Sequence, residues 1–267
     1  MESGLFVHWD AVEKWLRHKN IFLFLDYDGT LVPIAPRPEE AILSQDVRSY
    51  LSHLAGLPNC KLAIVSGRAL SDIKSMVGLE GIYYAGNHGL EISGPEVDLK
   101  SGDFQKQKDI LNTVREALEK NLSGINGAFV EDKGWTLSFH YRMVESDDLE
   151  RAKAIFEDAV KAPRSHGQVK IVAGKKVLEV RPAVDWDKGN VIAWLLDRVE
   201  FENKEAPIGP VYIGDDVTDE DAFRYLKGIG LTIGVGEERK TNVQYLLNDP
   251  ADVFEFLKRL FLLLSEG

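Results

Sequence analysis

Three polar segments of the sequence each follow directly on a short apolar run. They are Asp26-Tyr27-Asp28-Gly29-Thr30, Ser66-Gly67-Arg68 and Gly214-Asp215-Asp216-Val217-Thr218-Asp219. Such apolar runs are typical of buried parallel strands, and ligands bind beyond the carboxyl ends of these strands in an open sheet. We therefore expect the three segments to meet at one site. Carboxylates gathered there would repel one another without a cation, and their oxygens suit a hard ion such as Mg²⁺.

Asp26 and Asp28 have the spacing of a nucleophile and an acid–base partner. If Asp26 attacks phosphorus, a second carboxyl must protonate the departing alkoxide and then deprotonate water. Gly29 permits the abrupt turn that would bring both acids to the site. The same residues also fit an ordinary turn after a strand, and the motif alone leaves that alternative open. A calcium loop is excluded because Arg37 stands at the position that requires glutamate.

Lys188, Ser66 and Gly67 are candidates for binding a phosphoryl group. The ammonium group of Lys188, at the start of an expected helix, would stabilise charge on the equatorial oxygens of that group. Ser66 and Gly67 offer a hydroxyl and backbone N–H groups at a strand-to-helix turn. Each also has an ordinary alternative, because a lysine at a helix start is usually solvated and a serine there is usually an N-cap. The order of the four motifs along the chain favours the catalytic interpretation.

The elements that would position these residues alternate between strand and helix. We predict strands at 21–25, 62–65, 211–213, 231–235 and 245–247. We predict helices at 44–55, 69–77 and 188–199, and a last helix with Asp249 as N-cap and Pro250 in its first turn. This alternation predicts an α/β fold with a doubly wound, Rossmann-like parallel sheet.

The middle of the chain follows a different order. We predict helix 104–122, strands 128–132 and 136–141, helix 147–160, and strands 169–173 and 176–181. This αββαββ order suits a small sheet covered on one face. We therefore expect an α+β cap domain at 99–181, inserted into a core formed by 1–98 and 182–267. Hinges are expected near 93–102 and 181–185, where Gly and Pro interrupt the pattern.

Composition and charge limit the classes of function. The 267 residues are 44% apolar, which is enough to bury a substantial core. The net charge of −11 disfavours nucleic acid and anionic membranes as partners, so a phosphorylated small molecule would need a local cation. The single Cys60 excludes an internal disulfide framework, and the start MESGLFVHWD lacks the regions of a signal peptide. A cytoplasmic monomer is the working expectation.

The ordered motifs resemble the haloacid-dehalogenase superfamily of phosphotransferases. The resemblance implies that Asp26 is the nucleophile and Asp28 the acid and base, and that Ser66 and Lys188 bind phosphate. It implies a Mg²⁺ site formed by Asp26, the backbone carbonyl of Asp28, Asp215, Asp216 and Asp219.

Within this superfamily the chain is similar to trehalose-6-phosphate phosphatases, on segments 25–31, 85–91, 138–142, 177–182 and 212–220. The similarity implies Mg²⁺-dependent hydrolysis of trehalose 6-phosphate through an aspartyl-phosphate, as the final step of trehalose biosynthesis. It also implies a cap that closes over the disaccharide. The substrate-binding residues so implied are Arg68, Asn87, His88, Glu91, Glu131, Lys133, Arg142 and Glu179. For those of the cap, exposed charges paired across a hairpin remain an alternative.

Other functions compete with this interpretation. A phosphatase for another phosphosugar, such as sucrose phosphate or mannosyl phosphoglycerate, would use the same core chemistry. A phosphosugar mutase would pass the phosphoryl group to a second hydroxyl without net release of phosphate. A signalling receiver would be shorter and would lack the inserted cap, and a purely binding protein would not need both Asp26 and Asp28.

Overall fold

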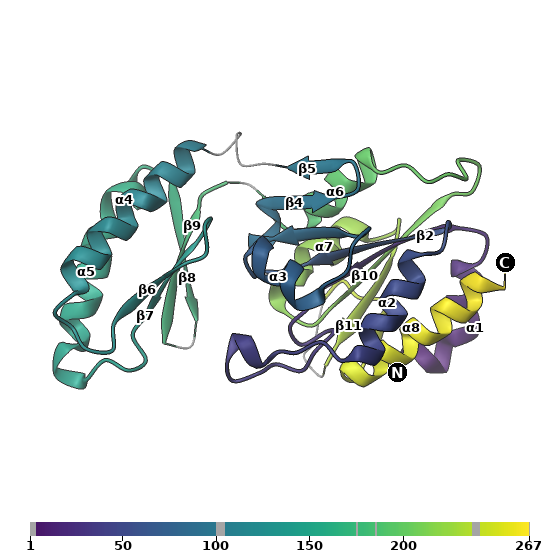
Figure 1. Cartoon of the computed structure of the whole chain (residues 1–267), viewed down its shortest axis with the longest axis horizontal. Coiled ribbons are helices and arrows are strands. Elements are labelled where there is room, and N and C mark those ends of the chain that lie inside the picture. Colours follow the sequence, from purple (N-terminus) through teal and green to yellow (C-terminus); the bar gives the residue numbers. More distant parts are fainter. Residues whose placement is uncertain (1–3, 100–104, 175, 185, 237–240, 267) are drawn as a thin grey trace. The chain divides into compact units, whose positions relative to one another are not determined.

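The computed structural model of the chain describes residues 4–99, 105–174, 176–184, 186–236 and 241–266 (Figure 1). The chain divides into two compact units, which we call the core unit and the cap unit. The core unit comprises Met1–Leu99 and Trp186–Gly267, and the cap unit comprises Lys100–Asp185. The domain boundaries suggested by the sequence, after residues 98 and 181, stay a prediction.

The core unit is built on a sheet in the order β12-β11-β10-β1-β2-β3-β4-β5. Its central strand β1 (Asn20–Leu25) is buried along its whole length, as expected for a parallel strand covered on both faces. The other parallel strands of the sheet are β10 (Ile208–Gly214), β2 (Cys60–Val65), β3 (Tyr83–Gly86), β11 (Leu231–Val235) and β12 (Tyr245–Leu247). Antiparallel β4 (Glu91–Gly94) and β5 (Val97–Leu99) extend one edge. The predicted doubly wound α/β fold is confirmed.

Helices cover both faces of this sheet, and alternate residues of β1 enter separate cores. Ile21, Leu23 and Leu25 pack with helices α1 (Trp9–Leu16), α2 (Gln45–Ala55), α3 (Leu70–Val77) and α8 (Pro250–Ser265). Phe22 and Phe24 pack with α6 (Lys188–Arg198) and α7 (Glu220–Leu226) on the opposite face. Each fully buried side chain of this size contributes about 1.5–3 kcal/mol of burial free energy. The face of the next residue, Asp26, is therefore fixed by packing.

Side chains cap the starts of α2 and α8, and the N-cap predicted at Asp249 is confirmed. Ser44 accepts a hydrogen bond from the Val47 amide, and Asp249 accepts bonds from Ala251 and Asp252 before Pro250 opens α8. Other elements were not predicted: α1, α7, and strands β3, β4 and β5. Most of these are short, and β4 and β5 have only four and three residues, which is too few to show a periodic pattern although Ile92, Val97 and Leu99 pack on the core.

The cap unit is a four-stranded antiparallel sheet with two helices. The sheet order is β6-β7-β9-β8, from β6 (Phe129–Asp132), β7 (Leu137–His140), β9 (Val177–Pro182) and β8 (Val169–Gly174). Helices α4 (Gln105–Leu122) and α5 (Ser146–Ser165) cover one face through a core that includes Leu137, Phe139 and Val180. The predicted end of α5 at Val160 is wrong, because the helix continues through Pro163 to Ser165. Phe104, the predicted start of α4, and residues 100–102 and 185 of the predicted hinges lie outside the described residues.

Candidate active site

The three polar segments lie at the carboxyl ends of adjacent parallel strands. Asp26 follows β1, Ser66 follows β2 and Asp215 follows β10, and β1 pairs with both of the other strands. Asp26 has the same parity along β1 as Phe22 and Phe24, so it lies on the sheet face covered by α6 and α7. This placement brings Asp26 to the side from which Lys188 and Asp219 approach.

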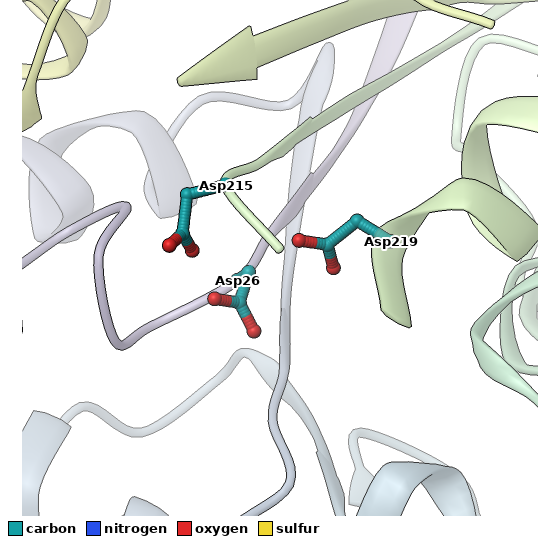
Figure 2. A group of neighbouring side chains, drawn as sticks. All are labelled: Asp26, Asp215 and Asp219. Atoms are coloured by element: carbon teal, nitrogen blue, oxygen red, sulfur yellow. The ribbon is translucent and has the colours of Figure 1, made fainter. Parts of the chain in front are cut away.

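Asp26, Asp215 and Asp219 form an acidic cluster. One carboxylate oxygen from each residue lies within 4.8 Å of the others, and Figure 2 shows the three side chains gathered around one space. Asp26 and Asp219 are buried, and Asp215 is partly buried and accepts a hydrogen bond from the Thr30 hydroxyl at 3.2 Å. Burial, aided by the charge of Asp219, raises the pKa of Asp215 to about 6. A cluster of carboxylate oxygens with this excess of negative charge fits a hard divalent cation.

Lys188 is the buried cation of the cluster. Its side chain is 3% exposed, and its Nζ donates to Asp26 Oδ1 at 2.8 Å and to Asp219 Oδ1 at 2.5 Å. Burial alone lowers the pKa of Lys188, but Asp219 and Asp26 outweigh it and raise that pKa above its ordinary value. For Asp26, burial has the opposite effect and raises the pKa of the carboxyl well above its usual range, although the charge of Lys188 acts to lower it. The alternative of a solvated lysine at a helix start is therefore wrong.

The position of Lys188 in its helix is unfavourable without these partners. Lys188 is the first residue of α6, where the helix dipole is positive, and Asp187 caps that helix by accepting from the Asn190 amide at 2.9 Å. Gly189 follows because a side chain there would lie 2.8 Å from the Asp221 carbonyl. The carboxylates of Asp26 and Asp219 must therefore offset both burial and the dipole.

Two glycines allow the acidic segments to approach each other. A Cβ atom on Gly29 would lie 2.0 Å from Asp215 Oδ2, and the residue has a left-handed φ of +86°. A Cβ atom on Gly214 would lie 2.4 Å from Cγ of Asp219. Both segments thus need glycine for close packing of the acids, and Gly29 also needs it for its backbone conformation.

The carboxylate of Asp28 is paired with Arg68. The Arg68 Nε donates to Asp28 Oδ2 at 2.6 Å and its Nη2 donates to Oδ1 at 2.5 Å, which is a bidentate pair. The guanidinium group also donates to the Pro38 carbonyl and lies over the Tyr27 ring. The hydrogen bonds to Asp28 raise the pKa of Arg68. The sequence suggested Arg68 as a substrate ligand, whereas the structure places it on the predicted acid and base.

Asp216 does not bring its carboxylate into the cluster. Its Oδ1 accepts from the Val217 amide at 2.7 Å, and its Oδ2 accepts from the Thr218 hydroxyl at 3.2 Å. The Asp216 amide in turn donates to Asp219 Oδ2 at 2.8 Å, which completes a capping box. The side chain thus orders the turn that carries Asp219, and its predicted contribution to a metal site stays a prediction.

Residues 87–89 are bonded to the turn that contains Ser66. The Asn87 amide donates to the Arg68 carbonyl at 2.7 Å, and the His88 amide donates to the Ser66 carbonyl at 3.0 Å. Both Asn87 and His88 have left-handed φ angles, of +50° and +57°. The Asn87 side chain donates to Glu91 at 2.9 Å. The structure therefore brings the predicted ligands Asn87, His88 and Glu91 to the turn formed by Ser66, Gly67 and Arg68.

Ser66 and Gly67 are confined within that turn. Ser66 is buried, and its Oγ accepts from the Arg68 amide at 3.1 Å. The N-cap of α3 is Ala69, so the alternative of Ser66 as an N-cap is wrong. A Cβ atom on Gly67 would lie 2.6 Å from the imidazole of His88. The turn thus presents a short, tightly packed edge beside the acidic cluster.

Glu131, Lys133 and Glu179, three of the predicted cap ligands, lie close to neighbouring charged or polar side chains. Glu131 lies 2.8 Å from His140 Nε2 and 4.0 Å from Lys133 Nζ, and Glu179 accepts from Arg181. Arg142 is exposed and follows β7 after one residue. The contact of Glu131 with His140 crosses the β6–β7 hairpin, whereas Glu179 contacts Arg181 of its own strand, β9, so this contact of Glu179 is not a pairing across a hairpin.

Several residues of these networks were not predicted. Tyr212 donates to Asp219 Oδ1 at 2.6 Å from a buried position on β10, and Trp186 donates to the Gly89 carbonyl at 2.7 Å. Burial, with the charge of Asp219 next in size, raises the pKa of Tyr212 well above its usual range. A polar ring within an apolar strand was the available signal for Tyr212, since its hydroxyl needs a partner when buried.

Comparisons with known proteins identify the family of the chain. The sequence model of the family described as trehalose-phosphatase matches residues 24–249. Trehalose-phosphate phosphatase B of Arabidopsis thaliana is 38% identical over 263 residues, which cover 94% of this chain and 69% of that protein. Trehalose 6-phosphate phosphatase RA3 of Zea mays is 36% identical over 258 residues, or 91% of this chain and 70% of that protein.

Solved structures show the same fold. The trehalose-6-phosphate phosphatase of Aspergillus fumigatus matches with a TM-score of 0.65 and 30% identity, over 94% of this chain and 96% of that one. The C-terminal domain of the C. albicans trehalose-6-phosphate phosphatase matches with a TM-score of 0.74 and 24% identity, over the same shares. Among the described residues, no helix has the length and apolar character needed to cross a membrane.

Proposed function

Since the chain belongs to the trehalose-phosphatase family, we propose that it hydrolyses trehalose 6-phosphate to trehalose and phosphate with Mg²⁺, through a phosphorylated Asp26. The observation that carries the mechanism is the buried network in which Lys188 joins Asp26 to Asp219, with Asp215 in the same cluster. Burying a lysine between two carboxylates costs desolvation free energy. A role in phosphoryl transfer, where the ammonium group stabilises charge on the phosphoryl oxygens, accounts for its presence.

In the first step, an oxygen of Asp26 attacks phosphorus and the bond between phosphorus and the sugar O6 breaks. Asp28 donates a proton to that O6, so the sugar leaves as an alcohol. Lys188 stabilises charge on the phosphoryl oxygens, with Ser66 and the amide groups of its turn as further ligands. Arg68 bonds both carboxylate oxygens of Asp28 in the structure, so one of these two bonds must open when Asp28 carries the proton that it donates.

In the second step, Asp28 takes a proton from a water molecule, whose oxygen attacks the phosphorus of the aspartyl-phosphate. The bond between phosphorus and Asp26 breaks, which releases phosphate and restores both acids to their starting forms. Asp26, Asp215, Asp219 and the Asp28 carbonyl would hold Mg²⁺, whose charge would neutralise the acids and the phosphate. Asp216 would contribute through the turn that it caps.

We further propose that the polar face of the cap sheet, with Glu131, Lys133, Arg142 and Glu179, binds the sugar hydroxyls. Carboxylates accept hydrogen bonds and Lys and Arg donate them, so these residues together offer a polyol both kinds of partner. Asn87, His88 and Glu91 would add contacts from the core unit. Other phosphosugar esters would use the same core chemistry, so the cap residues are expected to decide the substrate.

Phosphate release tests this function. We expect rapid Mg²⁺-dependent release from trehalose 6-phosphate, and little from sucrose, glucose or mannose 6-phosphate or in EDTA. The Asp26→Asn variant should lose this activity, whereas Asp10→Asn, at an exposed helix position, should keep it. Preferred turnover of another ester would refute the substrate assignment alone. Conversion to an isomer without phosphate release would indicate a mutase.

A further inference from the structure

One face of the cap sheet is turned away from helices α4 and α5. Leu137, Phe139 and Val180 belong to the apolar core that those helices cover. Residues of the opposite parity on the same strands, such as Ser138, His140 and Glu179, therefore lie on the other face. We call the group Phe129, Glu131, Ser138, His140 and Glu179 the open-face row.

The register of the strands sets the members of this row side by side. Glu131 pairs with Ser138, and Ser138 pairs with Glu179, so two carboxylates flank one serine across three strands. In the neighbouring position, Phe129 pairs with His140. Ser138 is only 2% exposed although it faces away from the helices.

His140 is held in one orientation by two neighbours. Its ring stacks on Phe129 with centroids 4.5 Å apart and planes 9° from parallel. Its Nε2 lies 2.8 Å from Glu131 Oε2, and because an ionised carboxylate only accepts, Nε2 is the donor. The side chain of Phe129 is exposed, and 54% of this residue is accessible, so burial of the aromatic ring does not explain the stack.

We infer that His140 is a positioning residue for sugar recognition, which orients Glu131 through the Nε2–Oε2 hydrogen bond while Phe129 fixes the imidazole ring. This inference rests on the proposed function. The described contacts of Glu131 with His140 and Lys133 are both made by Oε2, so Oε1 is the oxygen presented to a sugar hydroxyl. Glu179 shows the same arrangement, since both described bonds from Arg181 reach its Oε2.

The need for such a residue follows from the exposure of Glu131. Its side chain is 43% accessible, and a glutamate with this freedom loses rotamer entropy when it binds a ligand. A carboxylate that is already oriented avoids that cost at the moment of binding. Loss of His140 should therefore weaken the binding of a sugar ester and leave the chemistry on phosphorus largely intact.

The test compares three variants with two substrates. For His140→Ala we expect the KM for trehalose 6-phosphate to rise roughly 10-fold with kcat changed by less than about twofold, since a hydrogen bond to a charged group is lost. His140→Gln, whose amide N–H can reach the carboxylate, should recover most of the loss. His166→Ala, at an exposed position after α5, is the matched control. Hydrolysis of p-nitrophenyl phosphate, which has no sugar, should be unchanged in all three.

A double-mutant cycle with Glu131→Gln isolates the coupling. If His140 acts through Glu131, the double variant should have nearly the KM of Glu131→Gln alone. Independent, multiplicative effects of the two substitutions would overturn the inference, as would an unchanged KM in His140→Ala. Loss of p-nitrophenyl phosphate hydrolysis in His140→Ala would also overturn it, since that indicates general damage. If the wild-type protein does not hydrolyse trehalose 6-phosphate, the proposed function fails, and with it the premise of the inference.

Discussion

In the core unit, the buried side chains of Asp26, Lys188 and Asp219 share one network, whereas in the cap unit Glu131 and Glu179 are partly exposed and contact neighbouring side chains. Lys188 is 3% exposed and bonds two acids at once, while Glu131 is 43% exposed and bonds a neighbour on the next strand. Coulombic interactions are strong in the buried network and screened on the exposed face. We therefore expect the rate of phosphoryl transfer to depend on each residue of the buried network. We expect sugar binding to depend on several weaker contacts of the cap. Substitutions in the two units should differ in size and in the kinetic constant that they change.

The largest effect is expected for Asp26→Asn. The amide cannot act as the nucleophile, so kcat should fall by about 10⁴-fold or more. Lys188 keeps Asp219 as a partner, so the fold should persist. Steady-state phosphate release and circular dichroism measure both quantities. Residual turnover within about 100-fold of wild type would show that another group attacks phosphorus.

Lys188→Met should impair both activity and stability. The substitution leaves Asp26 and Asp219 buried without their cation, which should cost about 3–5 kcal/mol of the free energy of unfolding. We expect kcat to fall about 10³-fold through the lost charge at the phosphoryl oxygens. Urea unfolding without metal measures the stability. Lys204→Met, at a side chain 71% exposed, is the control and should change neither quantity.

Gly29→Ala tests the close packing of the two acidic segments. The new methyl group would overlap Asp215 and the backbone is left-handed, so we expect activity to fall about 100-fold through displacement of Asp215. Gly81→Ala is a matched control, because Gly81 also has positive φ, +76°, but no described atom lies within 4 Å of its Cβ position. A similar loss of activity in both variants would show that backbone strain causes it, and would contradict the displacement of Asp215 as its cause.

Glu131→Gln should have a smaller effect, confined to binding of the sugar. We expect the KM for trehalose 6-phosphate to rise about 20-fold, because the amide replaces a charged acceptor. Hydrolysis of p-nitrophenyl phosphate should not change. Glu157→Gln, on the exposed side of α5, serves as the control. A fall in kcat for both substrates would contradict the division between the units.

The pH dependence of Mg²⁺ binding should be the mildest effect. Burial raises the pKa of Asp215 to about 6, so in the metal-free protein this residue binds a proton that Mg²⁺ must displace. Affinity should therefore weaken about 10-fold on lowering the pH from 7 to 5. Because the folded state binds this proton more tightly than the unfolded chain, Asp215 also makes metal-free stability fall as pH rises from about 4 to 6. Calorimetry checks the first expectation, and an affinity independent of pH would refute it.

The sequence predicted the central core strands and their polar ends because these carry strong local signals. Ile21 to Leu25 is a continuous apolar run before Asp26, and Asp249-Pro250 is a clear helix start, so both elements were found. The antiparallel edge formed by β4 and β5 was missed, because strands of four and three residues are too short to show a clear alternation of apolar and polar positions. The order of the strands brought Asp26, Asp215 and Asp219 together, as expected for parallel strand ends.

The pairing of side chains could not be predicted in the same way. Nothing in the segment Ser66-Gly67-Arg68 shows that Arg68 bonds Asp28, which lies 40 residues earlier. Asp216 stands in the acidic motif, yet its carboxylate bonds the turn that contains it, because the backbone N–H groups of a helix start compete for it. His140 was visible only as one residue of a motif, and its contact with Glu131 depends on the register of two strands.

Covalent labelling of the enzyme tests the central claim most directly. The protein would be mixed with trehalose 6-phosphate labelled with ³²P, quenched in acid within milliseconds, and digested to locate the label. We predict acid-stable label on the peptide that contains Asp26, with none in the Asp26→Asn variant. Phosphate release without any covalent label, or label on a peptide that lacks Asp26, would contradict the account.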